Sequence, residues 1–415
     1  MTRLAAYTIL RSGSATALCD VDRHADALGV DARERGLLRR IIGAELRRRA
    51  TLRAIVHAVA PALKNIELVT HLHIALAQAL FLDRIPPHAV LSECSEAVRT
   101  TLGPSKVRIA REFLKSIYER IENAQSGDPR RDLVGRNLSF REPIFRDPAE
   151  HPLLWAEEAL SMPAPMLKRW IAGHGEQRAH ALARFALDEP PLSMCVGRGE
   201  RAEVASELAR LGVSAREGLH GHILLAPSSS AELVTSSAPF TEGRLTLQGE
   251  SALRAAEALQ ARLGEELLHL CARSTPARLP LAEGIETHRA EFGEALGTRA
   301  FDGVFVDAPC SDTGVLAQHP EARWRFGPAF RAELAQVQTR WIERAAGLVR
   351  PGGRMVWSTR SLEPEENRRL IDAFLARHAH WSLAEDRESL PDVELTQERG
   401  VGPVDGGYCA RLVRR

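Results

Sequence analysis

Apolar residues recur at helical spacing through roughly the first 122 residues, which predicts an all-helical domain there. The clearest run is Leu37, Leu38, Ile41, Ile42 and Leu46. A second run, over residues 72–81, ends before Pro86 and Pro87, because proline lacks the amide that a helix interior needs. Later runs predict a helix that begins near His88 and another over Val107–Ile121.

Two further stretches separate this block from the C-terminal part of the chain. Residues 123–150 are polar and rich in proline, glycine and arginine, which is typical of a linker. Residues 151–250 mix helical and strand patterns, and the run that follows Pro190 predicts the start of a small α+β domain.

Residues 251–415 alternate strand and helix patterns, as doubly wound α/β sheets do. The run Pro351–Gly353 predicts a turn, and Pro364–Asn367 predicts the start of a helix. The fold class is therefore multidomain, with an α domain followed by α+β and α/β domains. The strands are predicted at Leu267–Cys271, Phe301–Val306 and Met355–Ser358.

Charge separates the two ends of this 415-residue chain, although its net charge is only +1. Residues 1–150 hold 24 Lys/Arg against 18 Asp/Glu, and the remainder holds 31 against 36. A basic N-terminal part favours contact with polyanions, although a solvated arginine-rich helix face explains the same numbers.

Other composition signals exclude several classes of protein. The six cysteines are scattered and form no CxxC pair, so neither a zinc site nor a disulfide framework is predicted. The histidines show no metal spacing, and no metal is expected. The first residues are too polar for a signal peptide, and no apolar stretch reaches membrane-spanning length. A reduced, cytoplasmic protein is expected.

The candidate chemistry follows the strand predicted at Phe301–Val306. The chain continues Asp307-Ala308-Pro309-Cys310-Ser311, and then His319-Pro320-Glu321-Ala322-Arg323-Trp324. An acid can hold a ring nitrogen or amino group of a nucleobase, and a thiol can add to the ring or assist product release. Both runs resemble the signature of the bacterial 16S ribosomal RNA 5-methylcytosine methyltransferase family (Sun/Fmu type).

This resemblance implies a domain arrangement, a cofactor and a partner. Residues 81–99 resemble part of the NusB-like RNA-binding domain, which would span residues 1–122. Residues 251–415 would form a Rossmann-like, class I methyltransferase domain that uses S-adenosylmethionine. The implied partner is RNA, and ribosomal RNA in particular. The arginines expected to contact it are Arg39, Arg40, Arg47, Arg48 and Arg323.

The family's nucleophile is missing. In the family, the cysteine that adds to the cytosine ring lies in Thr-Cys-Ser, just before Pro-Glu-Glu-Asn. This chain reads Thr359-Arg360-Ser361 before Pro364–Asn367, so Arg360 occupies that position. A guanidinium stays protonated and offers no nucleophilic lone pair. Cys310 and Asp307 remain as candidate catalytic residues.

The cofactor loop also departs from the family pattern, which is Asp-x-Cys-Ala-Ala-Pro-Gly-Gly-Lys-Thr. His269 stands in place of the acid, and both glycines are absent. Cys271, Ala272 and Asp307 are the residual candidates for contact with the cofactor. The acid that would hold the ribose hydroxyls, at the end of the second strand, has no candidate in the sequence.

Length gives a separate indication. Cys271 and Asp307 are 36 positions apart, whereas one βαβ unit takes roughly 30 residues or more. The family arrangement needs two crossovers between these strands, and the space holds about one. A shortened cofactor half of the sheet is therefore expected.

Together these features predict an RNA-binding pseudoenzyme of the family, in which methyl transfer is lost. One alternative is an active S-adenosylmethionine-dependent cytosine-5 methyltransferase with relocated residues. Another is a protein-interaction module whose helical domain binds a partner protein. Calorimetry with the cofactor distinguishes the first two hypotheses, and salt-dependent RNA binding distinguishes the first from the third.

Overall fold

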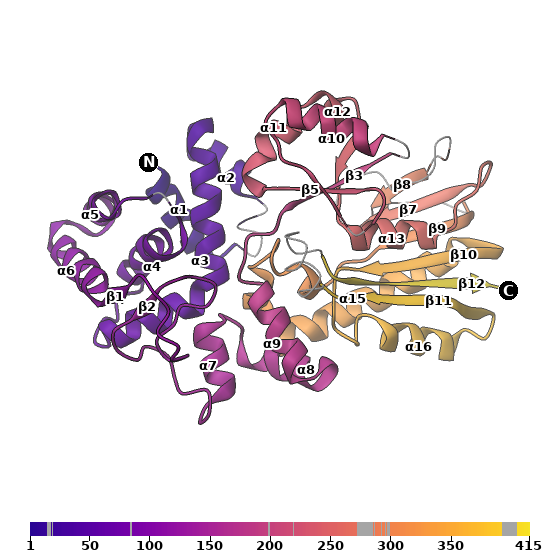
Figure 1. Ribbon diagram of the computed structural model, residues 1–415. Helices are drawn as coiled ribbons and strands as arrows, with labels where there is room; N and C mark the ends of the chain where they lie inside the picture. The colour runs from indigo at the N-terminus through magenta and orange to yellow at the C-terminus, as the bar shows by residue number, and fades with distance from the viewer. Residues whose placement is uncertain are drawn as a thin grey trace. The chain divides into compact units, whose positions relative to one another are not determined.

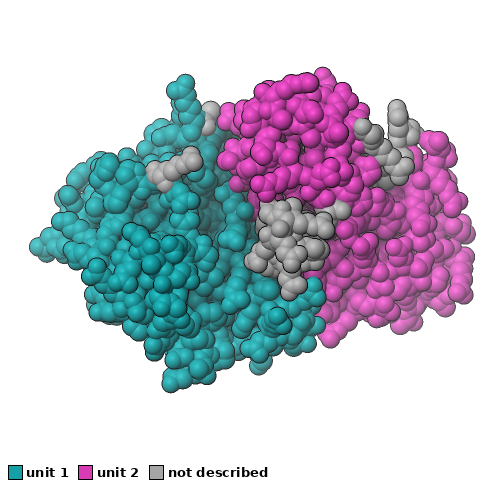
Figure 2. Space-filling view, viewed as in Figure 1, with its two compact units in different colours: residues 1–189, 317–325 teal, residues 190–316, 326–415 magenta. Residues whose placement is uncertain are grey.

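A computed structural model describes residues 1–14, 18, 20–83, 85–197, 200–218, 220–271, 285, 287–291, 293–294, 296, 299–391 and 405–415. The chain forms two compact units, coloured separately in Figure 2. Unit 1 comprises residues 1–189 and 317–325, and unit 2 comprises residues 190–316 and 326–415. Each is described by itself. The three-domain division with a linker, drawn from the sequence, stays a prediction.

Unit 1 is almost entirely helical, as the periodicity predicted (Figure 1). Side chains fix two of the helix starts: Asp31 accepts from the backbone N–H of Arg33 at 2.8 Å, and Asn65 accepts from that of Leu68 at 2.7 Å. The helices are α1 (Thr2–Arg11), α2 (Val21–Ala27), α3 (Ala32–Val59), α4 (Ile66–Phe81), α5 (Pro87–Leu102), α6 (Pro104–Arg120), α7 (Pro152–Ala159), α8 (Ala164–His174), α9 (Glu176–Phe185) and α14 (Ala322–Arg325).

The apolar run of α3 builds the core against α1, α2 and α4. Leu38, Ile41, Ile42 and Leu46 are buried there with Ile9, Val21 and Ile74. Pro87 starts α5 close to the predicted position. Prolines are tolerated at the first helical position, because the amide there has no partner within the helix.

The buried Glu45 carboxylate of α3 contacts an arginine of the same helix and a histidine of α4. The Glu45 carboxylate accepts from Arg49 Nε at 2.9 Å and lies 3.2 Å from His73 Nδ1. Burial alone would raise the pKa of Glu45, but the Arg49 charge and the hydrogen bonds from both partners lower it to about 2. Glu45 is therefore ionised in the folded protein at neutral pH, and its partners compensate its charge.

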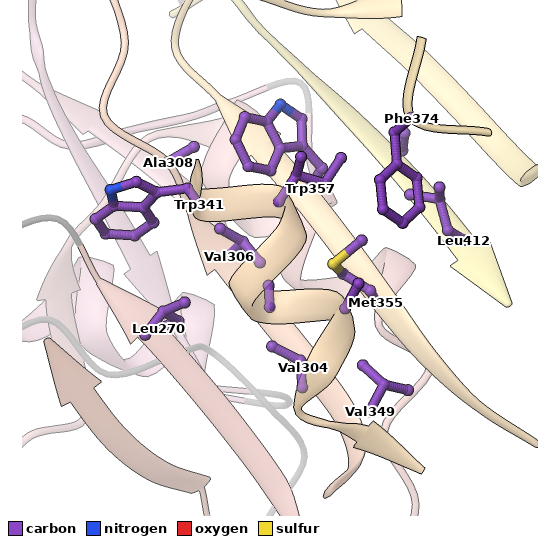
Figure 3. Close-up of a cluster of buried hydrophobic side chains, with 14 of the residues drawn as sticks. Leu270, Val304, Val306, Ala308, Trp341, Val349, Met355, Trp357, Phe374 and Leu412 are labelled. Atoms are coloured by element: carbon purple, nitrogen blue, oxygen red, sulfur yellow. The ribbon is translucent and has the colours of Figure 1, made fainter. Parts of the chain in front are cut away.

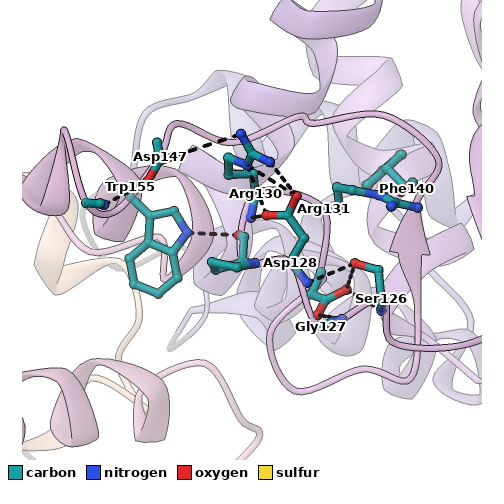
Figure 4. A network of polar contacts seen from close by, with 11 residues as sticks. Ser126, Gly127, Asp128, Arg130, Arg131, Phe140, Asp147 and Trp155 are labelled. Carbon is teal, nitrogen blue, oxygen red and sulfur yellow. Dashed lines mark hydrogen bonds and ion pairs between the residues drawn. The ribbon is translucent and has the colours of Figure 1, made fainter.

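The segment over residues 123–150 contains one short strand, β2 (Ser139–Phe140), which pairs antiparallel with β1 (Ile121–Glu122). Figure 4 shows the polar contacts that hold it. Asp132 accepts from Ser126 Oγ at 2.7 Å, and Trp155 Nε1 donates to the Pro129 carbonyl at 2.9 Å. Phe140 is fully buried. Residues 123–150 therefore have the composition of a linker but pack against the rest of unit 1.

Unit 2 begins with a small antiparallel sheet in the order β4-β5-β3-β6. Its core is formed by the buried faces of these strands and of α10, with Val204, Leu208 and Val234 among the buried side chains. The elements are β3 (Leu192–Val196), α10 (Arg201–Arg210), β4 (Arg216–Glu217), β5 (Ile223–Ala226), η1 (Ser228–Ser230), α11 (Ala231–Thr235), α12 (Ala238–Thr241) and β6 (Leu245–Leu247).

A second sheet in unit 2 has six strands in the order β11-β12-β10-β9-β7-β8. β8, β7, β9 and β10 run parallel, and β12 lies antiparallel between β10 and β11. The elements are α13 (Glu250–Ala258), β7 (Leu267–Cys271), β8 (Thr287–Glu291), β9 (Phe301–Asp307), η2 (Thr313–Val315), α15 (Pro328–Gly347), β10 (Val349–Thr359), α16 (Arg368–Arg377), β11 (Trp381–Ser389) and β12 (Gly407–Arg414).

Helices cover both faces of the central strands, which explains their continuous apolar runs. Alternate residues point to opposite faces of a strand. One set packs with α15 and α16, as Figure 3 shows, and includes Val304, Val306, Met355, Trp357, Trp341 and Phe374. The other set packs with α13 and includes Phe305, Val356 and Leu259.

The strands predicted from the sequence are present, and three details of the prediction for this sheet and its helices differ from the structure. β9 extends to Asp307. The turn predicted at Pro351–Gly353 lies inside β10, where the pairing with β9 shifts register and Gly352 adopts a φ of 80°. The helix predicted to start at Pro364–Asn367 begins at Arg368. Within the described residues, no helix combines the length and apolarity that a membrane crossing would require.

We predict that Glu45→Gln destabilises the protein at neutral pH by about 3 kcal/mol, because it leaves the Arg49 guanidinium without its buried counter-charge. The pKa of Glu45 is lowered by folding, so its contribution is fully present above the usual carboxyl value of 4.5 and is lost as pH falls toward 2. Urea unfolding at several pH values should show the difference from wild type shrinking below pH 4.5. Glu67→Gln, an exposed change on α4, is the matched control. An unchanged difference across this pH range would contradict the assignment.

Candidate functional site

The carboxyl ends of four parallel strands bring polar residues into one row. Glu291 ends β8 and pairs with Cys271 of β7. Cys271 also pairs with Asp307 of β9, and Asp307 pairs with Ser358 of β10. In open α/β sheets, ligands bind in the crevice beyond this edge. The row is therefore the candidate site, and it contains Asp307, whose role in the site stays a prediction.

Glu291 corrects one expectation from the sequence, which found no acid at the end of the second strand. β8 is the strand adjacent to β7, and its last residue is an exposed glutamate. The pattern hid this strand because it lies at the sheet edge and buries only Ala290. β8 is the strand that the described residues between Cys271 and Phe301 contain, and the expectation of a shortened half-sheet stays a prediction.

In β7, His269 stands at the position where the family has an acidic residue, and its surroundings are unlike those of an exposed acid. His269 is buried and packs edge-on against Phe305, with ring centroids 5.4 Å apart. Burial, helped by the charge of Arg289, lowers the pKa of His269 to about 4, so the imidazole is neutral at neutral pH. Arg289 Nε lies 3.3 Å from Cys271 Sγ. Ala272, a candidate from the sequence, lies outside the described residues.

Arg360 follows β10 and meets the loop that follows β9. Its guanidinium forms a 3.0 Å ion pair with Asp312, and its backbone N–H donates to Cys310 Sγ at 3.3 Å. The Cys310 thiol in turn lies 3.4 Å from the Asp312 carboxylate and donates to it. Asp312 adopts a left-handed φ of 61°, which turns the loop back toward Arg360. The structure thus brings together Arg360 and Cys310, two of the residues selected from the sequence.

Electrostatics favour the protonated form of the Cys310 thiol. Burial raises its pKa well above the usual thiol value, and the Asp312 charge raises it further. A thiol protonated at neutral pH is a poor nucleophile. Burial also raises the pKa of Asp307, although the nearby Arg360 charge opposes that shift.

Beneath this surface, three hydroxyl groups join the two loops. Ser361 Oγ lies 3.0 Å from Ser311 Oγ and 3.3 Å from Thr313 Oγ1. Thr313 Oγ1 also accepts from the backbone N–H of Leu362 at 2.9 Å. All three hydroxyl-bearing residues are buried. Buried polar groups of this kind hold a fixed geometry when they are hydrogen-bonded to one another.

The Glu366 and Asn367 side chains of the Pro-Glu-Glu-Asn run complete the same network. Glu366 Oε2 accepts from the Ser311 backbone N–H at 2.9 Å and from Gln338 Nε2 at 3.1 Å. Asn367 Oδ1 accepts from Thr359 Oγ1 at 2.6 Å, and its amide donates to the Ser361 carbonyl at 2.8 Å. These two side chains therefore hold the loops in place.

Gly314 permits a close approach of backbone segments in this region. A Cβ atom there would lie 2.6 Å from the Gly406 carbonyl oxygen and 3.0 Å from that of Arg360. The approach is used, because Gly314 N donates to the Arg360 carbonyl at 2.9 Å and Gly406 N donates to the Gly314 carbonyl at 2.8 Å. The loop after β9 is thereby tied to residues at the start of β12.

Three of the arginines expected to contact RNA are buried in unit 1. Arg47 donates from Nη2 to the Ala317 carbonyl at 2.8 Å, and Arg48 donates to that of Val134 at 2.8 Å. Arg323 donates to the carbonyls of Ser161 and Ala186 at 3.1 and 2.8 Å. Burial lowers the pKa of Arg48 to about 10 and that of Arg323 to about 9. This arrangement corrects the expectation that they lie on the RNA-facing surface.

These contacts give the His319–Trp324 run a structural role. Residues 317–325 belong to unit 1, although they follow the loop that contains Cys310. Trp324 Nε1 donates to the Leu46 carbonyl at 2.8 Å, and its ring lies 5.7 Å from the Arg49 guanidinium. The sequence could not show this, because buried and exposed arginines of α3 are adjacent in the chain.

Arg39 and Arg40 lie on the exposed side of α3. Arg39 forms a 2.6 Å ion pair with Asp22. Their contact with RNA stays a prediction. No group of metal-ligating side chains occurs among the described residues.

The fold and the site together define a class of protein. Unit 1 is a helical domain, and unit 2 ends in a mixed sheet whose parallel strands present polar residues at their carboxyl ends. This is a Rossmann-like methyltransferase domain combined with a NusB-like helical domain.

Comparisons with known proteins agree with this class. The family model for 16S rRNA methyltransferase RsmB/F matches residues 258–403, and the model for the NusB family matches residues 4–109. The ribosomal RNA small subunit methyltransferase B of Klebsiella pneumoniae is 29% identical over 383 residues, which is 82% of this chain and 80% of that protein. The probable ribosomal RNA small subunit methyltransferase B of Bacillus subtilis is 24% identical over 347 residues, covering 74% and 72%.

Among solved structures, the crystal structure of PH0851 is similar with a TM-score of 0.71 and 19% identity. The match covers 99% of this chain and 97% of that one, and it supports the fold. The chain belongs to the RsmB/F-type family of 16S rRNA methyltransferases, with its NusB-like domain.

We predict that Gly314→Ala destabilises unit 2 by about 1–3 kcal/mol, because the added methyl group meets backbone atoms that cannot rotate away. Gly347→Ala is the matched control, since nothing lies within 4 Å of its Cβ position and alanine is the better helix former. Urea denaturation of both variants measures the effect. Equal stability of the two variants would show that the loop yields more easily than its contacts indicate.

Proposed function

We propose that this protein binds structured RNA, ribosomal RNA in particular, and does not methylate cytosine. Arg360 at the family's nucleophile position carries this proposal. Methylation at carbon 5 requires a nucleophile that first adds to the neighbouring ring atom and makes carbon 5 electron-rich. A guanidinium cannot form that bond, because its nitrogens remain protonated and delocalised at any relevant pH.

The contacts of Arg360 support the proposal that arginine is well accommodated at the family's nucleophile position. Its ion pair with Asp312 and its backbone contact with Cys310 use the groups that surround the missing nucleophile. Cys310 is a poor substitute, because burial raises the pKa of its thiol. The network around Ser361 and Glu366 meanwhile keeps the loops in place. The hydrogen-bond network that holds the loops is therefore retained, whereas the nucleophile position carries an arginine.

The described residues match the family's S-adenosylmethionine site only in part. His269 is buried, neutral and apolar in its packing, so it does not replace the acid of the family's cofactor loop. Glu291 lies where an acid could hold ribose hydroxyls. The positions of the family's two glycines, Thr275 and Pro276, lie outside the described residues. We therefore expect weak cofactor binding or none.

An active methyltransferase is the second candidate function, and Glu291 is the observation that favours it. An acid at the end of β8 restores one of the groups that the sequence had seemed to lack. In such an enzyme, a residue other than Arg360 would have to add to the base. Methyl-transfer measurements therefore decide between the two candidates.

We predict that the purified protein gives no calorimetric isotherm with S-adenosylmethionine at micromolar concentration. The physical reason is the replacement of the loop acid by a neutral, buried His269. A ligand that binds only the folded state also raises the melting temperature, so an unchanged melting temperature is expected. A clear isotherm, or a melting temperature that rises with cofactor, would contradict the prediction.

We further predict that Arg360→Cys does not restore methylation. The variant supplies a thiol beside Cys310, but the reaction also needs a methyl donor held close and in line. Transfer of radiolabelled methyl from S-adenosylmethionine to ribosomal RNA should stay at background for the wild type, for Arg360→Cys and for the control Arg369→Cys, which replaces an exposed arginine of α16. Transfer by Arg360→Cys alone would show that the cofactor site works. Transfer by the wild type would overturn the proposed function.

A further inference from the structure

A basic groove lies on the surface of unit 1, along α5 and α6. It has a volume of about 420 Å³ and is lined by Arg99 of α5 and by Pro104, Val107, Arg108, Arg111, Glu112 and Lys115 of α6. Figure 1 shows the two helices at one end of the helical unit. Four of these side chains are cationic and one is anionic, so the groove is strongly positive. None of them belongs to the set selected from the sequence.

The helical repeat explains why the cations form a row. Arg108, Arg111 and Lys115 are spaced by three and four residues, so they lie on one face of α6. The buried residues Phe113, Leu114 and Ile117 hold the opposite side of the helix in the core. Seven residues of helix rise about 10 Å, which is the length of three to four consecutive nucleotides of one strand in a duplex.

The cationic side chains of the groove are only partly compensated by the groups around them. The side chain of Arg108 is 85% exposed, and its 3.8 Å ion pair with the 68% exposed Glu112 is long and screened by water. Pro104, the first residue of α6, also lines the groove. The positive end of the α6 dipole there lies next to the negative end of the α5 dipole, so the attraction for an anion comes from the side chains.

We propose that this groove binds the phosphodiester backbone of RNA, and the proposal rests on the RNA-binding function proposed above. Five of the seven lining residues are charged, and the other two, Pro104 and Val107, are small and include no aromatic anchor of the kind a protein partner would use. Arginine dominates it, and arginine matches the planar geometry of phosphate oxygens. The groove would position RNA without reading its sequence, because phosphate contacts carry none.

Fluorescence anisotropy with a fluorescein-labelled RNA stem-loop tests the groove in the full chain. We expect Arg108→Glu/Arg111→Glu/Lys115→Glu to weaken binding at least about tenfold at ~0.1 M salt, and the slope of log affinity against log salt to fall by about one for each cation removed. Glu112→Gln removes the one anionic side chain and should strengthen binding. Arg108→Gln/Arg111→Gln/Lys115→Gln should weaken binding less, and provides a second test if the charge reversal unfolds.

The matched control is Arg53→Glu/Arg178→Glu/Arg184→Glu, which changes the charge equally at exposed positions of the same unit and should alter the affinity less than about twofold. Wild-type affinity in the groove variants, together with loss in Arg39→Glu/Arg40→Glu, would overturn the groove and leave the proposed function standing. Equal losses in the control and the groove variants would also overturn the groove, because the attraction would then be diffuse. Failure of the wild type to bind the stem-loop would overturn both.

Discussion

The parallel pairing of β9 with β10 is the constraint on which the candidate site depends. It places Asp307 opposite Ser358, so the loops that follow the two strands leave the sheet at the same edge. Helices cover both faces of these strands, and a one-residue register shift would move each apolar side chain to the opposite face, away from the residues it packs against. The position of Arg360 beside Cys310 is therefore fixed by the burial of the sheet.

The residues shared with the family divide into two groups by what they contact. Glu366 and Asn367 face inward and bond the loops together, so their loss would leave buried donors and acceptors unpaired, at about 1–3 kcal/mol each. Arg360 is exposed and ion-paired, so its identity costs the fold little. The nucleophile position can therefore change without loss of the hydrogen bonds that hold the loops in place. This explains why the Pro-Glu-Glu-Asn run persists beside a changed nucleophile position.

Arginine has two roles in unit 1 that composition does not separate. Arg47, Arg48 and Arg323 donate to backbone carbonyls inside the unit, where each satisfies acceptors that would otherwise be buried without partners. The cations of α6 are exposed and share a groove. Charge counting over the first 150 residues includes both kinds, so it overstates the basic surface near α3 and gives no hint of the row on α6.

The sequence alone determined the helical domain, the apolar strands of the α/β sheet and the replacement of the nucleophile, because each depends on local periodicity or on a motif in unbroken register. Three features depended on the tertiary structure. Strand β8 is short, polar and at the sheet edge, so it lacks the apolar signal that would have revealed Glu291. The burial of Arg47 and Arg323 arises from contacts about 270 and 140–160 positions away in the chain. The groove forms only when α5 and α6 pack, since helical spacing defines a face but not the neighbour beside it.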